Sequence, residues 1–212
     1  MANTRKNPKE RIYKTAVTLF SRYGYAAVGV RDIAKKADIN ISMVSYYYGG
    51  KIGILREIIE RFFDGYISRI TSIEIGSQST EDIIQAIITN VVTYIRANKK
   101  EAIIVFAELP HDVPEITEMK RNKIRRLVDL MSTLPERMGV KPGDNELMAI
   151  VGPTLISTAF SNFLFGPLVG KIFNVTFDDA FYERYIKTIS TILLYGVTGL
   201  SEGTRGRKRN ND

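Results

Sequence analysis

Residues 30–51 read VRDIAKKADINISMVSYYYGGK, which is two short helix-forming runs on either side of a tight turn. In the first run, Ile33, Ala34 and Ala37 fall on one helical face, and charged side chains occupy the others. Gly29 precedes the run as a tolerable but weak N-cap. This spacing predicts a short helix over residues 30–37.

The turn and the second run follow directly. Asp38 tolerates left-handed backbone and Asn40 is a good N-cap, so residues 38–40 are predicted to form the turn. The second helix is expected over residues 41–48, where Gly49 and Gly50 end it. Two short helices joined by a three-residue turn form a helix-turn-helix, whose second helix enters the DNA major groove.

Three adjacent tyrosines lie in the second helix of this pair. Side chains of successive helical residues are about 100° apart, so the three cannot all face one core. We predict that Tyr48 is buried and that Tyr46 and Tyr47 lie on the exposed side. Ordinary core packing is the alternative for each tyrosine, and we favour it for Tyr48 alone.

The flanking sequence supplies two further helices. Residues 9–23 carry an apolar stripe at helical spacing and stop at Gly24. From Lys51 a longer apolar-periodic run predicts one helix to about Ile73.

The rest of the chain also has helical periodicity and no convincing strand pattern. We expect five more helices, over residues 81–98, 99–109, 115–134, 145–165 and 179–199, with a break at Gly166 to Phe177. The predicted fold is therefore all-α with about nine helices. The expected organisation is a three-helix helix-turn-helix domain at 8–55, with the helix at 51–73 as a link, a larger helical domain at 56–204, and a basic disordered tail at 205–212.

The net charge of +7 is unevenly distributed along the 212 residues. Residues 1–65 hold twelve Lys/Arg and six Asp/Glu, whereas residues 66–204 hold fourteen Lys/Arg and sixteen Asp/Glu. A basic N-terminal third on a nearly neutral body suggests a polyanion-binding module, although a merely solvated basic face is the alternative.

Several classes of protein are disfavoured by composition. The chain has no cysteine, which removes disulfides and thiolate metal sites and fits a cytoplasmic location. The first fourteen residues lack an apolar signal-peptide core, and the apolar stretch at 147–175 is read as buried helix broken by loops rather than a membrane span. The lone His111 among loop acids is poor support for a metal site, and no catalytic constellation stands out. We therefore expect neither a cofactor nor an enzyme.

The stretch from Arg11 to Leu55 resembles the N-terminal domain of the TetR family of transcriptional regulators. The family pattern ILxxAxxLFxxxGY is matched from Ile12 to Phe20 and at Gly24–Tyr25, and VRDIAxxAGVSxGxLYYHFxxKExLL is matched from Val30 onwards. Four positions depart from the pattern: Gly29 replaces Thr or Ser, Asp38 replaces the turn glycine, Asn40 replaces the serine cap, and Ser45 replaces an aromatic residue. These changes leave the fold intact and imply that the operator sequence differs from those bound by other members of the family.

The resemblance implies a role for individual residues of the helix-turn-helix and for Lys51 directly after it. Tyr47 would touch the DNA backbone, Lys51 would hold a phosphate, and Arg31 would contact phosphate or a base at the groove edge. The major-groove face would consist of Asn40, Ile41, Ser42, Met43, Ser45 and Tyr46. Tyr48 occupies the position of a buried phenylalanine.

The resemblance also implies a homodimer on pseudopalindromic double-stranded DNA and a small-molecule effector bound by the larger domain. Dimer candidates at helical spacing in the last two helices are Met148, Val151, Leu155, Ala159, Asn162, Phe181, Tyr185, Ile189, Ile192 and Leu193; intramolecular packing is the alternative. Effector candidates are Tyr94, Phe106, Leu109, Met119, Leu127, Met131, Phe160 and Phe163, whose apolar bias suggests a hydrophobic effector.

The expected function is that of an effector-responsive repressor that binds its operator as a dimer and is released by a small ligand. Two alternatives stay open: a transcriptional activator of the same fold, and a helical small-molecule-binding protein whose basic domain no longer binds DNA. No membrane partner is expected.

Overall fold

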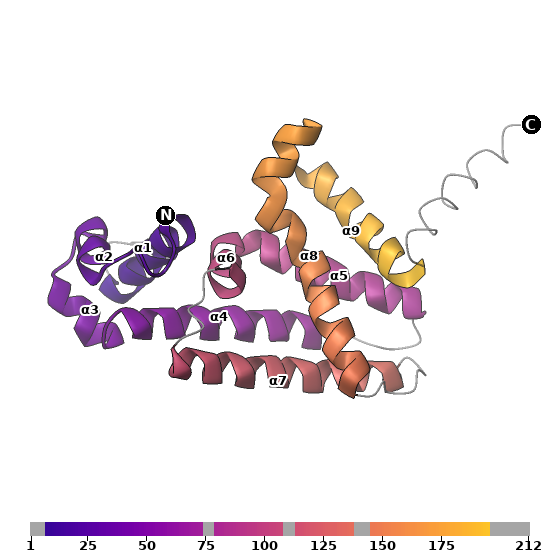
Figure 1. Cartoon of the computed structure of the whole chain (residues 1–212), viewed down its shortest axis with the longest axis horizontal. Helices are drawn as coiled ribbons and strands as arrows, with labels where there is room; N and C mark the ends of the chain where they lie inside the picture. The colour runs from indigo at the N-terminus through magenta and orange to yellow at the C-terminus, as the bar shows by residue number, and fades with distance from the viewer. Residues whose placement is uncertain (1–6, 74–78, 108–112, 138–144, 196–212) are drawn as a thin grey trace, which may run out of the picture. The chain divides into compact units, whose positions relative to one another are not determined.

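A computed structural model describes residues 7–73, 79–107, 113–137 and 145–195, with side chains left undescribed at 80, 107, 130–137, 145–153 and 155. Within these ranges the chain forms nine α-helices and no strand, which confirms the predicted all-α fold (Figure 1). The helices are α1 (Pro8–Tyr23), α2 (Val30–Ala37), α3 (Ile41–Tyr48), α4 (Lys51–Thr71), α5 (Thr80–Ala97), α6 (Lys99–Ala107), α7 (Pro114–Arg137), α8 (Asn145–Phe173) and α9 (Asp179–Tyr195).

The helices group into two compact units. Unit 1 contains α1 to α3, α4 as far as Tyr66, α6, and α7 as far as Arg125; unit 2 contains the remainder of α4 and α7 with α5, α8 and α9. Most of α4 groups with the N-terminal helices, and α6 contacts α1. The division into functional domains at residue 55 stays a prediction.

Local capping explains the ends of the first three helices. The Asn7 side chain accepts a hydrogen bond from the Glu10 backbone N–H at 3.3 Å, and the Gly24 N–H reaches the Phe20 carbonyl at 2.9 Å. Asp38 has φ +52°, the left-handed conformation predicted for the turn, and Asn40 caps α3. The bounds of α2 and α3 agree with the sequence prediction because these short-range signals determine them.

Arg11 of α1 fastens the turn between α2 and α3. Its guanidinium donates to the carbonyl oxygens of Ala37 and of Asp38, the latter at 2.8 Å, and lies 3.3 Å from the Asp38 carboxylate. The last carbonyls of a helix have no partner within the helix, so Arg11 satisfies groups that would otherwise need water. The turn is thereby attached to α1.

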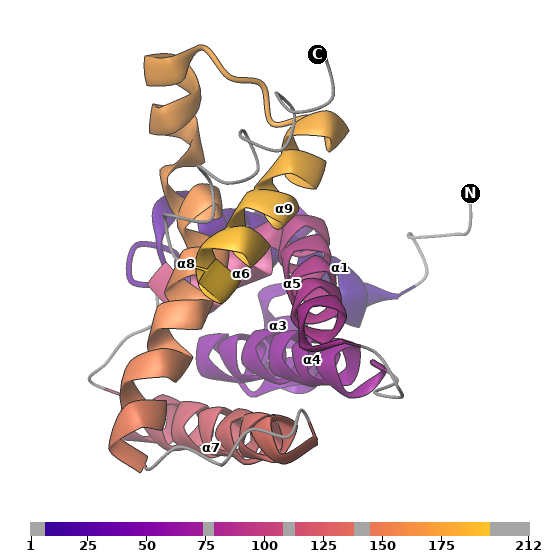
Figure 2. The same cartoon turned by 90° about the vertical axis from the view of Figure 1, so that its right-hand side faces the viewer.

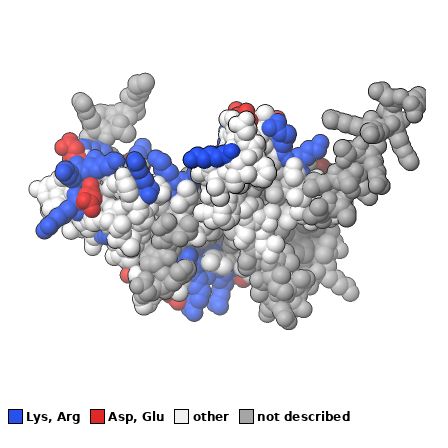
Figure 3. Space-filling model, turned by 45° about the horizontal axis from the view of Figure 1, so that its top comes forward, with Lys and Arg blue, Asp and Glu red and all other residues white. Residues whose placement is uncertain are grey.

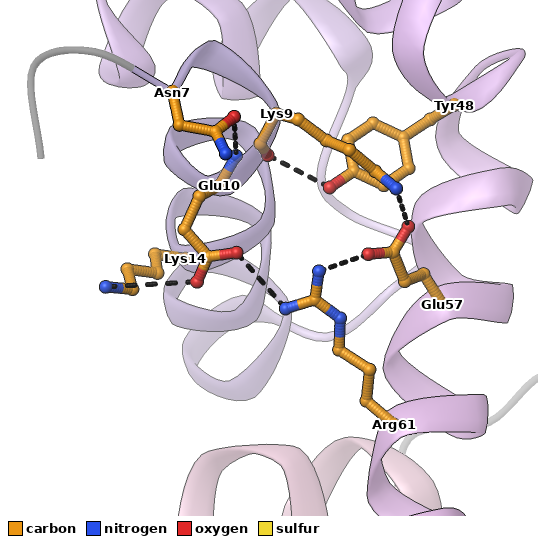
Figure 4. Close-up of polar contacts among 7 residues, drawn as sticks. All are labelled: Asn7, Lys9, Glu10, Lys14, Tyr48, Glu57 and Arg61. Carbon is orange, nitrogen blue, oxygen red and sulfur yellow. Dashed lines mark hydrogen bonds and ion pairs between the residues drawn. The ribbon is translucent and has the colours of Figure 1, made fainter.

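Tyr48, the last residue of α3, attaches this helix to α1. Its hydroxyl donates to the Lys9 carbonyl at 2.9 Å, and the Lys9 ammonium lies 5.4 Å from its ring centroid (Figure 4). Burial raises the pKa of the Tyr48 phenol, and the Glu57 carboxylate raises it further. The hydroxyl therefore remains a neutral donor over the physiological pH range.

A polar cluster joins the start of α1 to α4 beside this tyrosine. Glu57 pairs with Lys9 at 3.0 Å, and Arg61 bridges Glu57 to Glu10, the Glu10 contact being 3.1 Å (Figure 4). The Arg61 guanidinium also lies 4.2 Å from the Tyr13 ring centroid. Partly exposed ion pairs contribute little singly, but a bridging arginine between two carboxylates fixes the direction of α4.

Gly53 gives α4 its close approach to α3. A Cβ built on Gly53 would lie 1.7 Å from the Tyr48 carbonyl oxygen, a distance that no side chain can occupy. Because the opposing atom belongs to the backbone, it cannot rotate away. Glycine at this position therefore allows the tight connection between α3 and α4.

Unit 1 is completed by α6 and α7. The Lys100 ammonium of α6 contacts the Thr18 hydroxyl of α1 at 3.3 Å, and Phe106 packs edge-on against Phe62 of α4 with centroids 5.7 Å apart. Lys123 of α7 pairs with Asp64 of α4 at 2.6 Å.

Unit 2 is built on α5, α8 and α9, which lie side by side (Figures 1 and 2). Phe163 of α8 stacks on Tyr182 of α9 with centroids 5.5 Å apart. The Tyr185 hydroxyl donates to the Thr158 carbonyl at 2.8 Å, and Arg96 of α5 pairs with Asp179 at 2.7 Å.

Helix α8 continues to Phe173, so the predicted break at Gly166 was wrong. The Phe177 ring lies against Gly166 and Gly170, where added Cβ atoms would be 3.5 Å and 2.9 Å from it. Phe177 lies after the end of the helix, and its packing against α8 outweighs the low helix propensity of Gly166 and Pro167. The helix ends at Phe173, because the next residue, Asn174, has left-handed backbone with φ +50°.

The C-terminal part of α8 leaves a row of apolar side chains uncovered. Within the described residues, the segment 156–173 is long and apolar enough to cross a membrane, a test that core helices of soluble proteins also pass. Only 22% of it is buried. We call the exposed row the α8 stripe; its members are 44–69% exposed and are Leu164, Phe165, Leu168, Ile172 and Phe173.

The role of Tyr48 can be tested by graded truncation. Tyr48→Phe should lower the free energy of unfolding by about 1 kcal/mol, because only the hydrogen bond to Lys9 is lost. Tyr48→Ala should lower it by about 3–5 kcal/mol, because the buried ring is also removed. Urea unfolding followed by circular dichroism measures both. Tyr46→Ala, in the same helix but exposed, is the matched control and should change stability little; a comparable loss there would contradict the assignment.

The close contact at Gly53 makes a second prediction. Gly53→Ala should destabilise the protein by about 1–3 kcal/mol, because the methyl group collides with the Tyr48 carbonyl and α4 must move. Gly166→Ala is the control, since a Cβ there has ordinary contacts and alanine favours a helix by about 0.5–1 kcal/mol. Thermal melting of both variants gives the comparison, and equal stability of the two would refute the steric account.

Candidate nucleic-acid interface

Helix α3 has one anchored face and one free face. Val44 and Tyr48 are buried, which is where the helical spacing places them. The opposite face is exposed over Ile41, Ser42, Ser45 and Tyr46, while Met43 and Tyr47 are half-buried. The exposed face has the size and shape of an element that could enter a DNA major groove.

The two outward tyrosines support one another. Tyr46 is 82% exposed, and its ring meets the Tyr47 ring edge-on with centroids 5.0 Å apart. Edge-to-face aromatic pairs restrict both rings. Tyr46 is thus presented to solvent as a broad apolar surface, with Tyr47 behind it.

Asn40 is occupied as the cap of α3. Its side-chain oxygen accepts hydrogen bonds from the Ser42 backbone N–H at 2.9 Å and from the Ser42 hydroxyl at 2.8 Å. This arrangement supports the predicted cap but leaves only the amide N–H group of Asn40 for another partner.

Lys51, the first residue of α4, is held by aromatic rings. Its ammonium lies 4.0 Å from the Tyr25 ring centroid and 6.0 Å from that of Phe20. Burial lowers the pKa of the ammonium. A lysine stacked on a ring keeps its cationic head in one place, which suits contact with a phosphate oxygen.

Helix α2 begins at the other edge of the candidate interface. The Asp32 carboxylate accepts a hydrogen bond from the Gly29 N–H at 2.8 Å, which compensates for the missing N-cap side chain. Arg31 is exposed and has no ion-pair partner among the described residues. It is free to reach a phosphate or a base edge.

Basic side chains lie around these helices. Figure 3 shows Lys and Arg on the surface over the N-terminal helices, and the exposed ones in α1 and α2 are Lys14, Arg22, Arg31, Lys35 and Lys36. Such a surface attracts a polyanion at a distance and is sensitive to salt.

Two functional contacts were missed from the sequence. The sequence pattern does not predict that Arg11 fastens the helix-turn-helix turn or that Tyr25 holds Lys51. Both are contacts between residues about 26 positions apart, which periodicity cannot reveal. The Gly-Tyr pair after α1 is the one local signal that could have indicated Tyr25.

The predicted effector residues are divided between the two units. Phe106 and half-buried Met119 belong to unit 1, whereas Tyr94, Leu127, Phe160 and Phe163 belong to unit 2. Leu109 and the Met131 side chain lie outside the described residues, as does His111. The effector assignment stays a prediction.

The predicted dimer residues are in mixed environments. Ala159 and Ile189 are buried inside unit 2, and Asn162 has a buried side-chain oxygen without a hydrogen-bond partner. Phe181, Tyr185, Ile192 and Leu193 of α9 are half-buried. The side chains of Met148, Val151 and Leu155 lie outside the described residues.

The N-terminal helices are similar in sequence to those of known proteins. Residues 12–58 match the family model described as "Bacterial regulatory proteins, tetR family". The "Probable HTH-type transcriptional regulator YttP" of Bacillus subtilis is 30% identical over 113 residues, which cover 52% of this chain and 55% of YttP. The "Biofilm operon icaADBC HTH-type negative transcriptional regulator IcaR" of Staphylococcus epidermidis is 36% identical over 59 residues, 28% of this chain and 32% of IcaR.

The similarity in fold extends further along the chain. The fatty acid degradation regulator FadR from Bacillus halodurans superposes with a TM-score of 0.65 at 19% identity, covering 92% of this chain and 98% of FadR. The chain thus spans about half the length, or less, of the curated relatives it matches, but nearly the whole of a solved structure with the same fold.

Proposed function

We propose that the chain belongs by its N-terminal domain to the tetR family of bacterial regulatory proteins, whose model residues 12–58 match, and that it is a DNA-binding transcriptional regulator. The observation that carries the proposal is the free face of α3, an eight-residue helix anchored by Val44 and Tyr48 and exposed on its opposite side. A helix anchored in this way can enter the major groove while the contacts of its buried face stay intact.

Phosphate contacts would position α3 in the groove. Tyr47 lies near the C-terminal end of α3, and Lys51 is the first residue of α4. Arg31 lies in the first turn of α2. Contacts at these two sites would grip the backbone on either side of the groove. Asn40, Ile41, Ser42, Met43, Ser45 and Tyr46 would then face the base edges.

We propose further that the protein is a repressor. The relative IcaR is named a negative transcriptional regulator, and a protein that occupies an operator can block transcription without any additional activity. Activation by the same DNA-binding domain is the second candidate. A promoter-reporter assay with and without the protein distinguishes the two directions.

A small hydrophobic effector is proposed to control DNA binding. Aromatic side chains such as Phe106, Phe160 and Phe163 lie in the helical body, and apolar linings suit hydrophobic ligands. An effector can weaken DNA binding only if it binds the DNA-free conformation more tightly. Helix α4 contributes residues to both units and could therefore respond to such a ligand.

A homodimer is proposed to form through α8 and α9. Leu164, Phe165, Leu168 and Ile172 of the α8 stripe fall within about 100° of one another around the helix, and exposed apolar rows of this kind mark interfaces. Half-buried Phe181, Ile192 and Leu193 of α9 would extend the contact. A second copy is the natural occupant, because two-fold dimers present the same surface to one another.

DNA binding can be tested with the full chain and the DNA upstream of its own gene. Lys51→Ala and Tyr47→Ala should each weaken binding by about 1–3 kcal/mol, and Lys51→Ala should reduce the salt dependence by about one phosphate contact. Fluorescence anisotropy at several salt concentrations measures both quantities. The control Lys187→Ala removes an exposed lysine from α9 and should bind normally.

Two results would count against the proposal. Absence of any salt-sensitive, sequence-specific binding by the unmodified protein would favour the alternative of a helical small-molecule-binding protein. Normal affinity in both variants would show that DNA approaches another surface.

The dimer is tested by placing charge in the α8 stripe. Leu168→Glu combined with Ile172→Glu should convert the dimer to a monomer, because two carboxylates would be buried against two more from the partner. Sedimentation velocity measures the mass. Ile124→Glu, at a similarly exposed apolar position of α7, is the control and should stay dimeric. A dimer that survives the stripe substitutions would place the interface elsewhere.

A further inference from the structure

The free face of α3 contains no charged side chain. Its members are Ile41, Ser42, Met43, Ser45 and Tyr46, of which Ile41 is 44% exposed and Tyr46 is 82% exposed. The face is therefore made of apolar surface and hydroxyl groups. This composition limits which features of the base pairs it could recognise, provided that α3 binds DNA as proposed above.

The usual hydrogen-bonding pairs are missing from α3. Guanine is commonly read by an arginine or lysine that donates to O6 and N7, and adenine by an asparagine or glutamine that donates to N7 and accepts from N6. Asn40 is the one amide at this end of α3, and its oxygen already accepts two hydrogen bonds from Ser42. It cannot form the two-bond contact with adenine while it caps the helix.

The remaining serines provide little discrimination. Ser42 donates its hydroxyl proton to Asn40, which leaves it as an acceptor only. Ser45 is exposed and can either donate or accept, so it can meet several bases. Arg31, from α2, is the one guanidinium among the candidate DNA-contacting residues.

The major-groove edge of DNA carries one apolar group, the C5-methyl of thymine. Ile41 and Tyr46 both present exposed apolar surface on α3, and Met43 is half-buried. Covering this surface with thymine methyl groups removes apolar area of both partners from water, whereas no other base offers an equivalent.

We infer that α3 reads its operator through the methyl groups of thymine, with Ile41 and Tyr46 as the specificity-determining residues. The half-sites beneath α3 are accordingly rich in A·T pairs, and guanine is read only where Arg31 reaches the groove edge. Val44 and Tyr48 contribute by fixing which side of the helix faces the bases.

The first step of the test is selection of binding sites by the full chain from random duplex DNA. Each thymine of the enriched half-site is then replaced singly by deoxyuridine, which removes only the methyl group. Loss of one buried methyl corresponds to roughly three- to fourfold weaker binding, and this loss is expected at one or more thymines of each half-site. Exchange of such a T·A pair for C·G should weaken binding, and 5-methylcytosine at that position should restore part of it.

Protein variants identify the side chains responsible. In Ile41→Ala or Tyr46→Ala, the deoxyuridine penalty should fall to less than about 1.5-fold at the thymine that the missing side chain covers, since the methyl no longer has a partner. Ile124→Ala is the matched control, because Ile124 is 43% exposed in α7, and it should keep the full penalty.

The outcomes separate this inference from the proposed function. An enriched operator that tolerates deoxyuridine at every thymine would overturn thymine-methyl reading and leave DNA binding intact. Enriched half-sites in which the required bases are mostly guanines would likewise overturn thymine-methyl reading and leave DNA binding intact. Failure to enrich any sequence would overturn the proposed function and this inference together.

Discussion

The helix-turn-helix of α2 and α3 depends on the attachments of Tyr48. Its hydroxyl is bonded to the Lys9 carbonyl of α1, its ring is buried, and its own carbonyl lies where any side chain at position 53 of α4 would be. One residue therefore connects the consecutive helices α3 and α4 to α1, which lies about 40 residues earlier in the sequence. If Tyr48 were released, the end of α3 would lose its attachment to α1 and only the Arg11 contacts at the turn would remain, so the exposed face would be held less firmly.

Anchoring one side of α3 so firmly explains how its other side can be left without a partner. A short helix of eight residues is not stable by itself, and tertiary contacts must hold it. Arg11 attaches its beginning through the turn, and Tyr48 attaches its end. The residues between them can therefore be chosen for what they contact outside the chain. The three consecutive tyrosines divide accordingly: Tyr48 holds the helix, Tyr46 is exposed on its surface, and Tyr47 is half-buried against the Tyr46 ring.

Short-range sequence signals predicted the bounds of the short helices well. The structure differs from the sequence prediction where packing between residues distant in the sequence decides the outcome. The bounds of α2 and α3 were predictable because Asp38, Asn40 and Gly49 act on their immediate neighbours. The continuation of α8 past Gly166 was not predictable, because it depends on the Phe177 ring arriving from beyond the helix. The contacts of Arg11 and Lys51 belong to the same class. The exposed face of α3 could be deduced from helical spacing once Tyr48 was taken as buried, whereas effector and dimer residues lacked any comparable anchor in the sequence.

The chemistry of α3 also makes dimerisation matter more than it would for a helix with charged base contacts. An apolar side chain against a thymine methyl contributes about 0.8 kcal/mol, compared with about 1–3 kcal/mol for a bidentate hydrogen-bonded pair. A single α3 with two or three such contacts would discriminate poorly between sites. Two half-sites bound by one dimer add their free energies, so their specificity ratios multiply. If the α8 stripe brings two copies together as proposed, the modest selectivity of each α3 becomes useful.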